Sequence, residues 1–481
     1  MLTINDNAVQ LMTDVFKLSF RPGIQIKDQT TTALALRNGQ YERRIENLSP
    51  EVIQALSLVA EGRFSKEELS EQVFRKGGLG ALSLFHYNLI VLDQACLIDY
   101  ILYIDNEPYC RYENMIGETT FTDEQLHRQR FQLSSFAFLR RQQQHFVLES
   151  ANSTVKLTFL SSKALDLLAG LSNFGDLTRF TQQSSLDQKE ALAFLSALAT
   201  GGFLEFEYDQ SSQELSELWN FHDLLFHSRS RYGRHNKVSG GNYRFIGRRP
   251  PKAPKRAMPH ALKHIPLAVP RPETLRHSQS LAECMDKRKS DRVFGGMDLQ
   301  TLGHFLYRCL HVKGSRPYLV EARGQQQEIE ILSAPYPSGG GMYEIDFYLT
   351  INDCEGLAPG FYYYNGFEHQ LSLLAEKNEQ TELMLMYARI CAGITDSPPL
   401  LITFAADFAR MFWKYESMAY AAILKNVGVI YQTLYLVATD MGLGSCAIGN
   451  GNVEVFKKLT NFPLLQESSL GEFILGTPIK E

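Results

Sequence analysis

Apolar and polar positions near the start of the chain follow one order of local patterns. An alternating stretch over residues 34–45 predicts β structure, and Ser49-Pro50-Glu51 predicts the start of a helix over residues 52–59, because proline suits the first helical position. A capping-box sequence, Ser65-Lys66-Glu67-Glu68, starts a second short helix, a third amphipathic helix follows, and alternation over residues 100–112 predicts a β-hairpin. A strand, three short helices and a β-hairpin in this order are typical of a winged-helix domain.

The same order of patterns returns at an offset of roughly 110 residues, as a weak internal repeat. Alternation within residues 146–159 predicts a hairpin, three short helices are expected over residues 164–199, and residues 203–206 predict a strand. We therefore expect two winged-helix domains, at residues 1–118 and 119–214.

A change of composition follows the second copy. Residues 228–256 contain ten Lys or Arg and no Asp or Glu, and seven prolines lie between positions 250 and 272. Closely spaced prolines favour extended backbone, so residues 215–275 are expected to form a basic, proline-rich linker.

The last region, residues 276–481, has the pattern of an α+β domain. Residues 416–441 are apolar around most of the circumference of a helix, which predicts a helix buried in a core or a subunit interface. Asn365-Gly366 predicts a hairpin turn. Further helices are expected over 281–287 and 299–309, and strands over 343–350 and 360–364.

Composition excludes several classes of protein. The chain has 481 residues and a net charge of 48 − 53 = −5, which disfavours a globally basic nucleic-acid binder. Its seven cysteines include no CxxC pair, so we expect reduced thiols and no zinc site. His260 and His264 are four residues apart but lie between prolines, so no metal is expected there either. The apolar stretch 426–439 is shorter than the roughly 20 residues that cross a membrane, and residues 1–20 lack a signal-peptide pattern, so a cytoplasmic protein without a membrane partner is expected.

Three segments of the last region carry candidate binding chemistry. Arg288-Lys289-Ser290-Asp291-Arg292 offers two guanidinium groups and a hydroxyl, which suit a phosphate, although alone such a run is also typical of a solvated helix end. Residues 337–343 form a glycine-rich turn that enters a strand, where backbone N–H groups can approach a planar ligand. Residues 442–450 predict another glycine-rich turn after the long helix. Neither G-x-G-x-x-G nor a Walker sequence is present, so a Rossmann site is not indicated.

The string Arg410-Met411-Phe412-Trp413-Lys414-Tyr415-Glu416 carries candidate catalytic chemistry. Burial would lower the pKa of Lys414, and a phenol lies next to it, so the pair has the equipment of a general base with a hydrogen-bond partner. The alternative interpretation is the start of an amphipathic helix whose Lys414 extends to solvent.

Together, these segments resemble the SagB-type branch of the FMN-dependent nitroreductase superfamily. The resemblance rests on the order of Arg-x-Ser-x-Arg, Pro-Ser-Gly-Gly-Gly-Met-Tyr, Gly-Phe-Tyr-Tyr-Tyr, Trp-Lys-Tyr-Glu and Gly-Leu-Gly. Residues 219–231 resemble the strip that precedes this domain in the same branch. Members include azoline oxidases of ribosomal peptide pathways. The N-terminal part of this chain most resembles that of the cyanobactin oxidases, and its expected winged helices resemble RiPP recognition elements.

The resemblance implies a central mixed or antiparallel sheet surrounded by helices, in an intertwined homodimer that binds FMN between its subunits. It implies that Arg288, Ser290 and Arg292 hold the phosphate and ribityl chain. The isoalloxazine would be reached from the partner subunit by Pro337, Ser338 and Gly339 and lined near its reactive nitrogen by Gly444, Ile448 and Gly449. The catalytic pair would be Lys414 and Tyr415, and Lys480 is the basic residue available near the C-terminus.

The implied activity is dehydrogenation of thiazoline to thiazole, or oxazoline to oxazole, in a precursor peptide. Flavin would accept a hydride while Lys414 or Tyr415 removes a proton. A heterocyclase of the same pathway is an expected partner. The alternative is an NAD(P)H-dependent nitro or flavin reductase with winged-helix interaction modules.

The winged helices allow three interpretations: peptide docking at a sheet edge, a structural role, or DNA binding. DNA binding is disfavoured because the second helix of the first copy carries Glu67, Glu68 and Glu71 against Arg75 and Lys76, unlike a helix that reads a DNA groove.

Overall fold

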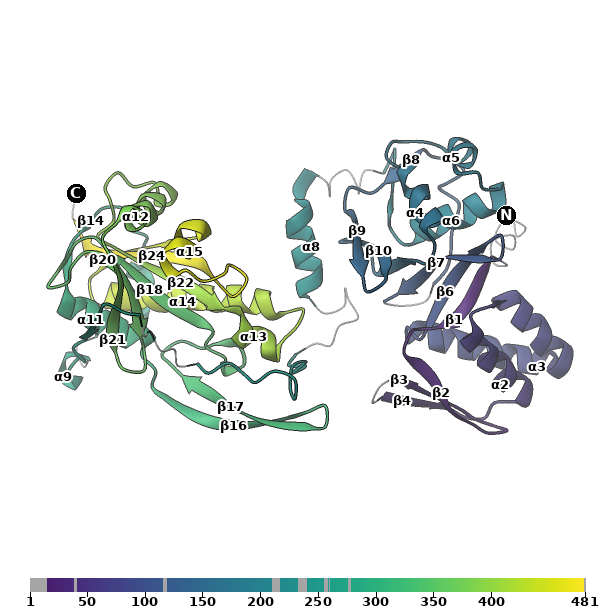
Figure 1. Ribbon diagram of the computed structural model, residues 1–481, viewed down its shortest axis with the longest axis horizontal. Coiled ribbons are helices and arrows are strands. Elements are labelled where there is room, and N and C mark those ends of the chain that lie inside the picture. Colours follow the sequence, from purple (N-terminus) through teal and green to yellow (C-terminus); the bar gives the residue numbers. More distant parts are fainter. Residues whose placement is uncertain are drawn as a thin grey trace. The chain divides into compact units, whose positions relative to one another are not determined.

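The computed structural model describes residues 15–38, 41–115, 119–209, 217–231, 240–254, 258, 260–275 and 278–479. It separates into two compact units, Met1–Asn236 and Lys237–Glu481, each of which is described by itself (Figure 1). The division falls within the region predicted to be a linker. The boundaries predicted at residues 118, 214 and 275 stay predictions.

A seven-stranded antiparallel sheet is the framework of the first unit. Its order is β5-β1-β6-β7-β11-β10-β9. The link between the two predicted halves is the pairing of β7 with β11, in which Tyr112 lies opposite Leu157. The strands are β1 (Phe16–Phe20), β5 (Phe64–Ser65), β6 (Ile98–Ile104), β7 (Glu107–Asn114), β9 (Ala137–Gln142), β10 (His145–Ser150) and β11 (Val155–Phe159).

Helices and smaller sheets surround this framework. The first half adds a three-stranded sheet of β2 (Ile24–Gln29), β3 (Leu34–Asn38) and β4 (Tyr41–Ile45), with α2 (Pro50–Leu58), η1 (Val59–Glu61) and α3 (Lys66–Gln94). The second half adds α4 (Ser162–Ala169), α5 (Leu177–Ser184), α6 (Gln188–Thr200) and the paired strands β8 (Phe131–Leu133) and β12 (Leu204–Phe206), followed by α8 (Phe221–Ser230).

Local signals in this unit were mostly interpreted correctly. The capping box at Ser65 is confirmed, because Glu68 N donates to Ser65 Oγ at 3.1 Å and Ser65 N donates to the Glu68 carboxylate at 2.6 Å. The two helices expected after it lie within α3, which is interrupted at Gly78 with φ of 66°. Winged-helix domains remain a prediction for both halves.

The second unit is built on an antiparallel sheet in the order β13-β21-β20-β18-β22-β24-β14, with β23 also paired to β24. This confirms an α+β fold with a central sheet. The strands are β13 (Lys263–Pro266), β14 (Phe294–Gly295), β18 (Ile345–Ile351), β20 (Gly360–Asn365), β21 (Gln370–Glu376), β22 (Leu400–Asp407), β23 (Gly444–Ile448) and β24 (Glu467–Pro478). Two short pairs lie outside it: β15 (Met297–Asp298) with β19 (Cys354–Glu355), and the hairpin β16 (Gly314–Ala322) with β17 (Gln325–Ser333).

Helices cover both faces of this sheet. Alternate side chains of the buried strands enter two cores, so Phe347 packs with α11 and α14 whereas Tyr348 packs with α12 and α15. The helices are α9 (Pro272–Leu275), α10 (Leu281–Lys287), α11 (Leu299–Leu310), α12 (Glu379–Ala392), α13 (Phe408–Lys414), α14 (Ala419–Asp440) and α15 (Val453–Thr460), with a 3-10 turn η2 (Gly339–Gly341).

The long apolar helix predicted at 416–441 is α14. Among the described helices it alone passes a test of length and composition for a membrane span, yet half of its most apolar window is buried within this unit. Ile423, Ile430 and Leu434 enter the core, while Tyr420 and Val429 are exposed. An apolar surface therefore remains on the outer side of α14.

One sequence interpretation is corrected here. Residues 442–450 were predicted to be a turn, but residues 444–448 form strand β23, in which Gly444 pairs with Gly476 and Ile448 with Glu472. A side chain at Gly444 would lie 3.3 Å from Phe294 and 3.4 Å from Pro478, so this glycine permits close strand packing. The turn itself is confined to the residues around Gly442, where φ is 69°.

Part of the region expected to be a linker is ordered on the second unit. Residues 263–266 form the edge strand β13, paired to β21. His264 Nδ1 lies 2.9 Å from Ser372 Oγ within this pairing. Across the part of the chain that the structure describes, no three His, Cys, Asp or Glu side chains gather as metal ligands.

Candidate functional site

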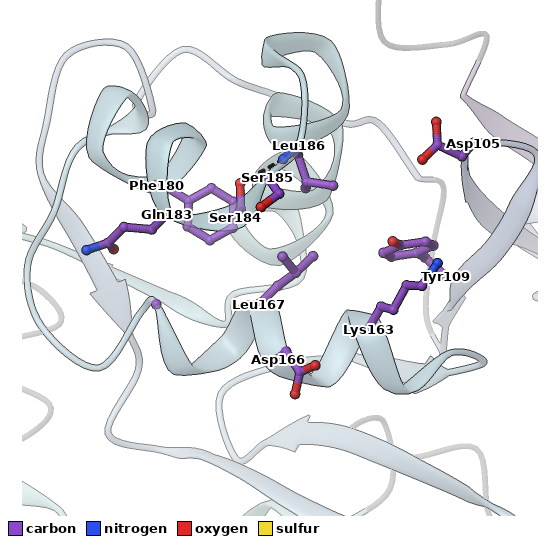
Figure 2. A pocket seen from close by; sticks show the side chains of 11 residues that line it. Asp105, Tyr109, Lys163, Asp166, Leu167, Phe180, Gln183, Ser184, Ser185 and Leu186 are labelled. Atoms are coloured by element: carbon purple, nitrogen blue, oxygen red, sulfur yellow. Dashed lines mark hydrogen bonds between the residues drawn. The ribbon is translucent and has the colours of Figure 1, made fainter.

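A cavity of about 310 Å³ opens in the first unit (Figure 2). The β6–β7 turn and helices α4 and α5 surround it, with Leu167 and Phe180 as apolar lining and Lys163, Asp166 and Tyr109 as polar lining. Lys163 already pairs with Glu107 at 3.3 Å. The cavity contains none of the predicted site residues, all of which belong to the second unit.

In the second unit the glycine-rich turn lies against the predicted catalytic pair. Lys414 Nζ donates to Gly340 O at 3.0 Å. Gly340 has φ of 64°, and a side chain there would overlap the Tyr415 hydroxyl and approach Lys414 Nζ at 2.7 Å. Glycine is required at this position both by the backbone conformation and by the close approach of the pair.

Helix α13 presents Lys414 and Tyr415 at its C-terminal end. The predicted alternative, a helix start at this string, is wrong, because Lys414 is the last residue of α13 and Tyr415 is its C-cap. Arg410 anchors the helix: its guanidinium is 3% exposed, lies 3.4 Å from the Asp346 carboxylate, and donates to Tyr343 O at 3.0 Å. The predicted catalytic pair is therefore attached to the start of β18 and to the turn before it.

Burial shifts the acid–base properties of the pair in opposite directions. It lowers the pKa of Lys414, because a half-buried ammonium loses solvation. It raises the pKa of Tyr415, and the nearby Glu344 carboxylate acts in the same direction. Lys414 is thereby favoured as a proton acceptor, and Tyr415 stays a protonated hydrogen-bond donor.

A buried network that the sequence analysis missed fixes the glycine-rich turn. Glu344 is fully buried and accepts from Asn426 Nδ2 at 2.8 Å and from Ser338 Oγ at 3.2 Å. Asn426 Oδ1 in turn accepts from Gly339 N at 3.1 Å. The available signal was an asparagine on the same helix face as Ile423 and Ile430, because a buried amide needs partners.

The segment 288–292 lies beside β23, as the resemblance implies for two parts of one binding site. Asp291 N donates to Ser445 O at 2.9 Å, and Ser445 N donates to the Asp291 carboxylate at 3.2 Å. Ser290 Oγ lies 2.8 Å from Tyr435 Oη, and Arg288 Cζ lies 5.1 Å from the centre of the same ring. Tyr435, on α14, was not identified from the sequence.

The glycine-rich turn and the 288–292 segment contact α14 at different positions along its axis. Asn426 contacts the glycine-rich turn and Tyr435 contacts the 288–292 segment, nine residues later (435 − 426). At 1.5 Å per residue this separation is about 14 Å along the helix. The chain therefore presents Pro337, Ser338 and Gly339 at one end of α14 and the arginine segment towards the other.

The arginine group fits the phosphate end of FMN. Arg288 and Arg292 form no ion pair with other residues of the described ranges, so both guanidiniums are available to an anion. A side chain added at Gly449 would meet nothing within 4 Å, which leaves open space beside the backbone after β23. Gly444 and Ile448 are buried in the strand, with the Ile448 side chain in the core, so only their backbone could approach a ligand. Lys480 lies outside the described residues.

Two family models match the chain. Residues 131–236 match the cyanobactin oxidase ThcOx, and residues 318–477 match the nitroreductase family. The second match contains the glycine-rich turn, the Lys414–Tyr415 pair and β23.

Two relatives are similar to parts of the chain. A Methanocaldococcus jannaschii protein described as a nitroreductase, MJ1384, is 24% identical over 190 residues, covering 38% of this chain and 87% of the relative. The microcin B17-processing protein McbC of Escherichia coli is 28% identical over 116 residues, covering 23% of this chain and 41% of McbC.

Among solved structures, a chain of the E. coli microcin synthetase McbBCD complex with truncated pro-MccB17 is 17% identical with a TM-score of 0.34, covering 57% of this chain and all of that one. A nitroreductase structure from Anabaena variabilis is 20% identical with a TM-score of 0.37, covering 52% of this chain and 45% of that one. The family matches confirm the resemblance found in the sequence: residues 318–477 match the nitroreductase family of oxidoreductases, and a segment that matches the cyanobactin oxidase lies ahead of them in the chain.

Proposed function

We propose that this protein is an FMN-dependent azoline oxidase that aromatises thiazoline or oxazoline rings in a ribosomally made precursor peptide. The observation that carries the proposal is the Lys414–Tyr415 pair on the backbone of Gly340, within the region that matches the nitroreductase family. The cyanobactin-oxidase match at residues 131–236 and the relative named for microcin B17 processing support a peptide substrate.

Aromatisation of an azoline removes a proton from the α carbon and a hydride from the neighbouring ring carbon. The flavin, when bound, supplies the two-electron acceptor for the hydride. The protein must supply the base, and Lys414 is the better candidate because burial lowers its pKa. Tyr415, whose pKa is raised, stays protonated and donates a hydrogen bond that orients the ring. A further turnover would require an external electron acceptor such as dioxygen.

In this proposal Arg288, Ser290 and Arg292 would bind the phosphate and ribityl chain, and the open space beside Gly449 would accommodate part of the isoalloxazine. The glycine-rich turn, about 14 Å away along α14, serves the flavin of the partner subunit. The exposed apolar residues of α14, Tyr420 and Val429, suit a subunit interface and support a homodimer.

The first unit is proposed to recruit the precursor peptide, and the enzyme to act with a heterocyclase that supplies azolines, in the cytoplasm. Among the described strands, β9 is the last of the seven-stranded sheet, and a peptide can add to such an edge as a further strand.

The test combines a spectrum with an assay. Protein purified with FMN should show the absorption of oxidised flavin, and a thiazoline peptide should bleach it under anaerobic conditions. Lys414→Ala and Tyr415→Phe should each retain flavin and lose thiazole formation. Rapid bleaching by NADPH, together with no reaction of the thiazoline peptide, would instead establish the nitro or flavin reductase. A protein that binds no flavin would exclude both activities.

A further inference from the structure

A segment outside the family match covers the catalytic pair. Residues 240–249, here called the strap, belong to the second unit and come from the basic region that was expected to be a linker. The strap makes a compact turn in which Ile246 N donates to Tyr243 O at 3.0 Å and Arg249 N donates to Phe245 O at 2.9 Å. Ile246 is buried in a small core with Trp413 and two residues of the β16–β17 hairpin.

Four contacts attach the strap to the end of α13. Asn242 N and Tyr243 N both donate to Lys414 O, at 3.0 and 3.2 Å. Asn242 Nδ2 donates to the Glu416 carboxylate at 2.7 Å, and Trp413 Nε1 donates to Arg249 O at 2.9 Å. These hydrogen bonds involve Lys414 itself and residues on both sides of it in the sequence, Trp413 and Glu416.

Tyr243 brings its ring to the Lys414 amine. Lys414 Nζ lies 5.8 Å from the centre of the Tyr243 ring and 5.5 Å from that of Tyr415. The Tyr243 ring is held edge-on to Trp413, with centres 5.7 Å apart. Two aromatic rings therefore surround the amine, one from its own helix end and one from the strap.

The backbone conformation of Tyr243 is unfavourable for a tyrosine, which indicates that this side chain serves a purpose other than local stability. Its φ is 46°, in the left-handed region that favours glycine or asparagine. A bulky residue held there costs on the order of 1 kcal/mol or more, and such residues cluster at functional sites.

We propose that the strap is part of the active site and that Tyr243 is a positioning residue that walls in the Lys414 amine on the side facing the peptide. The proposal rests on the azoline-oxidase function, because it assigns Tyr243 a task in presenting the base. It adds a residue from outside the nitroreductase match to the catalytic unit.

The physical effect of the ring is to exclude water from the amine. Burial is the cause that lowers the pKa of Lys414, and the strap supplies part of that burial. The carboxylates on neighbouring elements are engaged elsewhere: Glu416 with Asn242 and Arg244, and Glu344 with Asn426 and Ser338. The neighbouring Tyr415 phenol stays protonated, because burial raises its pKa.

The experiment compares Tyr243→Gly with Tyr243→Phe. Glycine removes the ring and also relieves the left-handed backbone, so folding should be preserved; Asn461→Gly, at another left-handed position with φ of 56°, is the matched control for that relief. The pH dependence of Lys414 acylation by acetic anhydride, followed by mass spectrometry, reports the pKa of the amine without any turnover. Circular dichroism and thermal unfolding report the fold.

Tyr243→Gly should raise the pKa of Lys414 and lower kcat/KM at pH 7 about tenfold for each unit of that rise, with an unchanged or higher Tm. Tyr243→Phe and Asn461→Gly should behave like the unaltered protein in both assays. If Tyr243→Gly leaves the acylation profile and kcat/KM unchanged, the proposal is overturned. If instead the acylation profile shifts but the unaltered protein converts no azoline, the positioning role stands and the proposed function fails.

Discussion

Ser290 and Tyr435 lie 145 residues apart in the chain, yet their hydroxyl oxygens are 2.8 Å apart. The Tyr435 hydroxyl also accepts from Ala447 N at 2.7 Å, so one phenol joins the arginine segment to β23.

Tyr435→Phe removes both of these bonds and should weaken FMN binding by about tenfold, because a net hydrogen bond contributes about 1 kcal/mol and a buried donor is left without a partner. Fluorescence titration of the apoprotein with FMN measures the change. Thr433→Ala, which removes an exposed hydroxyl from the same helix, is the control. Equal affinities of Tyr435→Phe and Thr433→Ala would show that this link plays no part in cofactor binding.

The approach of Gly340 to the catalytic pair can be tested against a glycine of the same conformation. Gly340 and Gly393 both have φ of 64°, but a side chain at Gly393 would meet nothing within 4 Å, whereas one at Gly340 would overlap the Tyr415 hydroxyl. Gly393→Ala should therefore cost only the backbone strain, about 1 kcal/mol of unfolding free energy, with activity retained. Gly340→Ala should carry the same strain and also lose most of the thiazole-forming activity. Similar activities of these two variants would contradict a functional role for the close contact between Gly340 and Tyr415.

Arg410 is a buried charge whose carboxylate partners lie on two strands. It is 3% exposed and lies 3.4 Å from Asp346 and 3.8 Å from Asp407. Removing one member of such a group leaves uncompensated charge, so Arg410→Met should lower the free energy of unfolding by about 3–5 kcal/mol. Lys457→Ala breaks a surface pair with Glu454 and should cost less than about 1 kcal/mol. Urea denaturation of the two variants measures the difference, which should vanish if the Arg410 network contributes nothing.

Glu472 should make stability depend on pH. It is 2% exposed, and burial raises its pKa to about 7. Because the folded state holds this proton more tightly than the unfolded state, the contribution to stability is present below pH 4.5 and is lost as the pH rises through 7. The loss is on the order of 3 kcal/mol. Glu472→Gln should abolish this part of the pH dependence when urea denaturation is followed from pH 5 to pH 8. Parallel curves for the two proteins would show that Glu472 is ionised in the folded state.

Several elements of both units could be predicted from local patterns. The long helix, the capping box at Ser65 and the α+β order follow from periodicity and end signals, and the Lys414–Tyr415 pair followed from the resemblance. Strand β23 was missed because four glycines near its ends resemble a turn, while tertiary pairing with β24 decides its conformation.

The partners of the site residues could not be predicted. Asn426, Tyr435 and Glu344 act through contacts between residues far apart in the sequence, and no local pattern encodes such contacts. Tyr243 could not be predicted to be a site residue for a second reason: the composition of its segment is that of a linker. The position of Tyr243 beside Lys414 depends on hydrogen bonds between backbone groups, which patterns of side chains do not reveal.

The pairing of β7 with β11 has a consequence for how the front of the protein can be divided. Phe16, Tyr109 and Tyr112 of the first half are buried together with Leu157 and Phe194 of the second. In a polypeptide that ends after residue 118, β7 would be an unpaired edge strand with its apolar side chains exposed to water. Such a polypeptide would tend to self-associate. Neither half of the first unit is therefore expected to fold when it is expressed without the other.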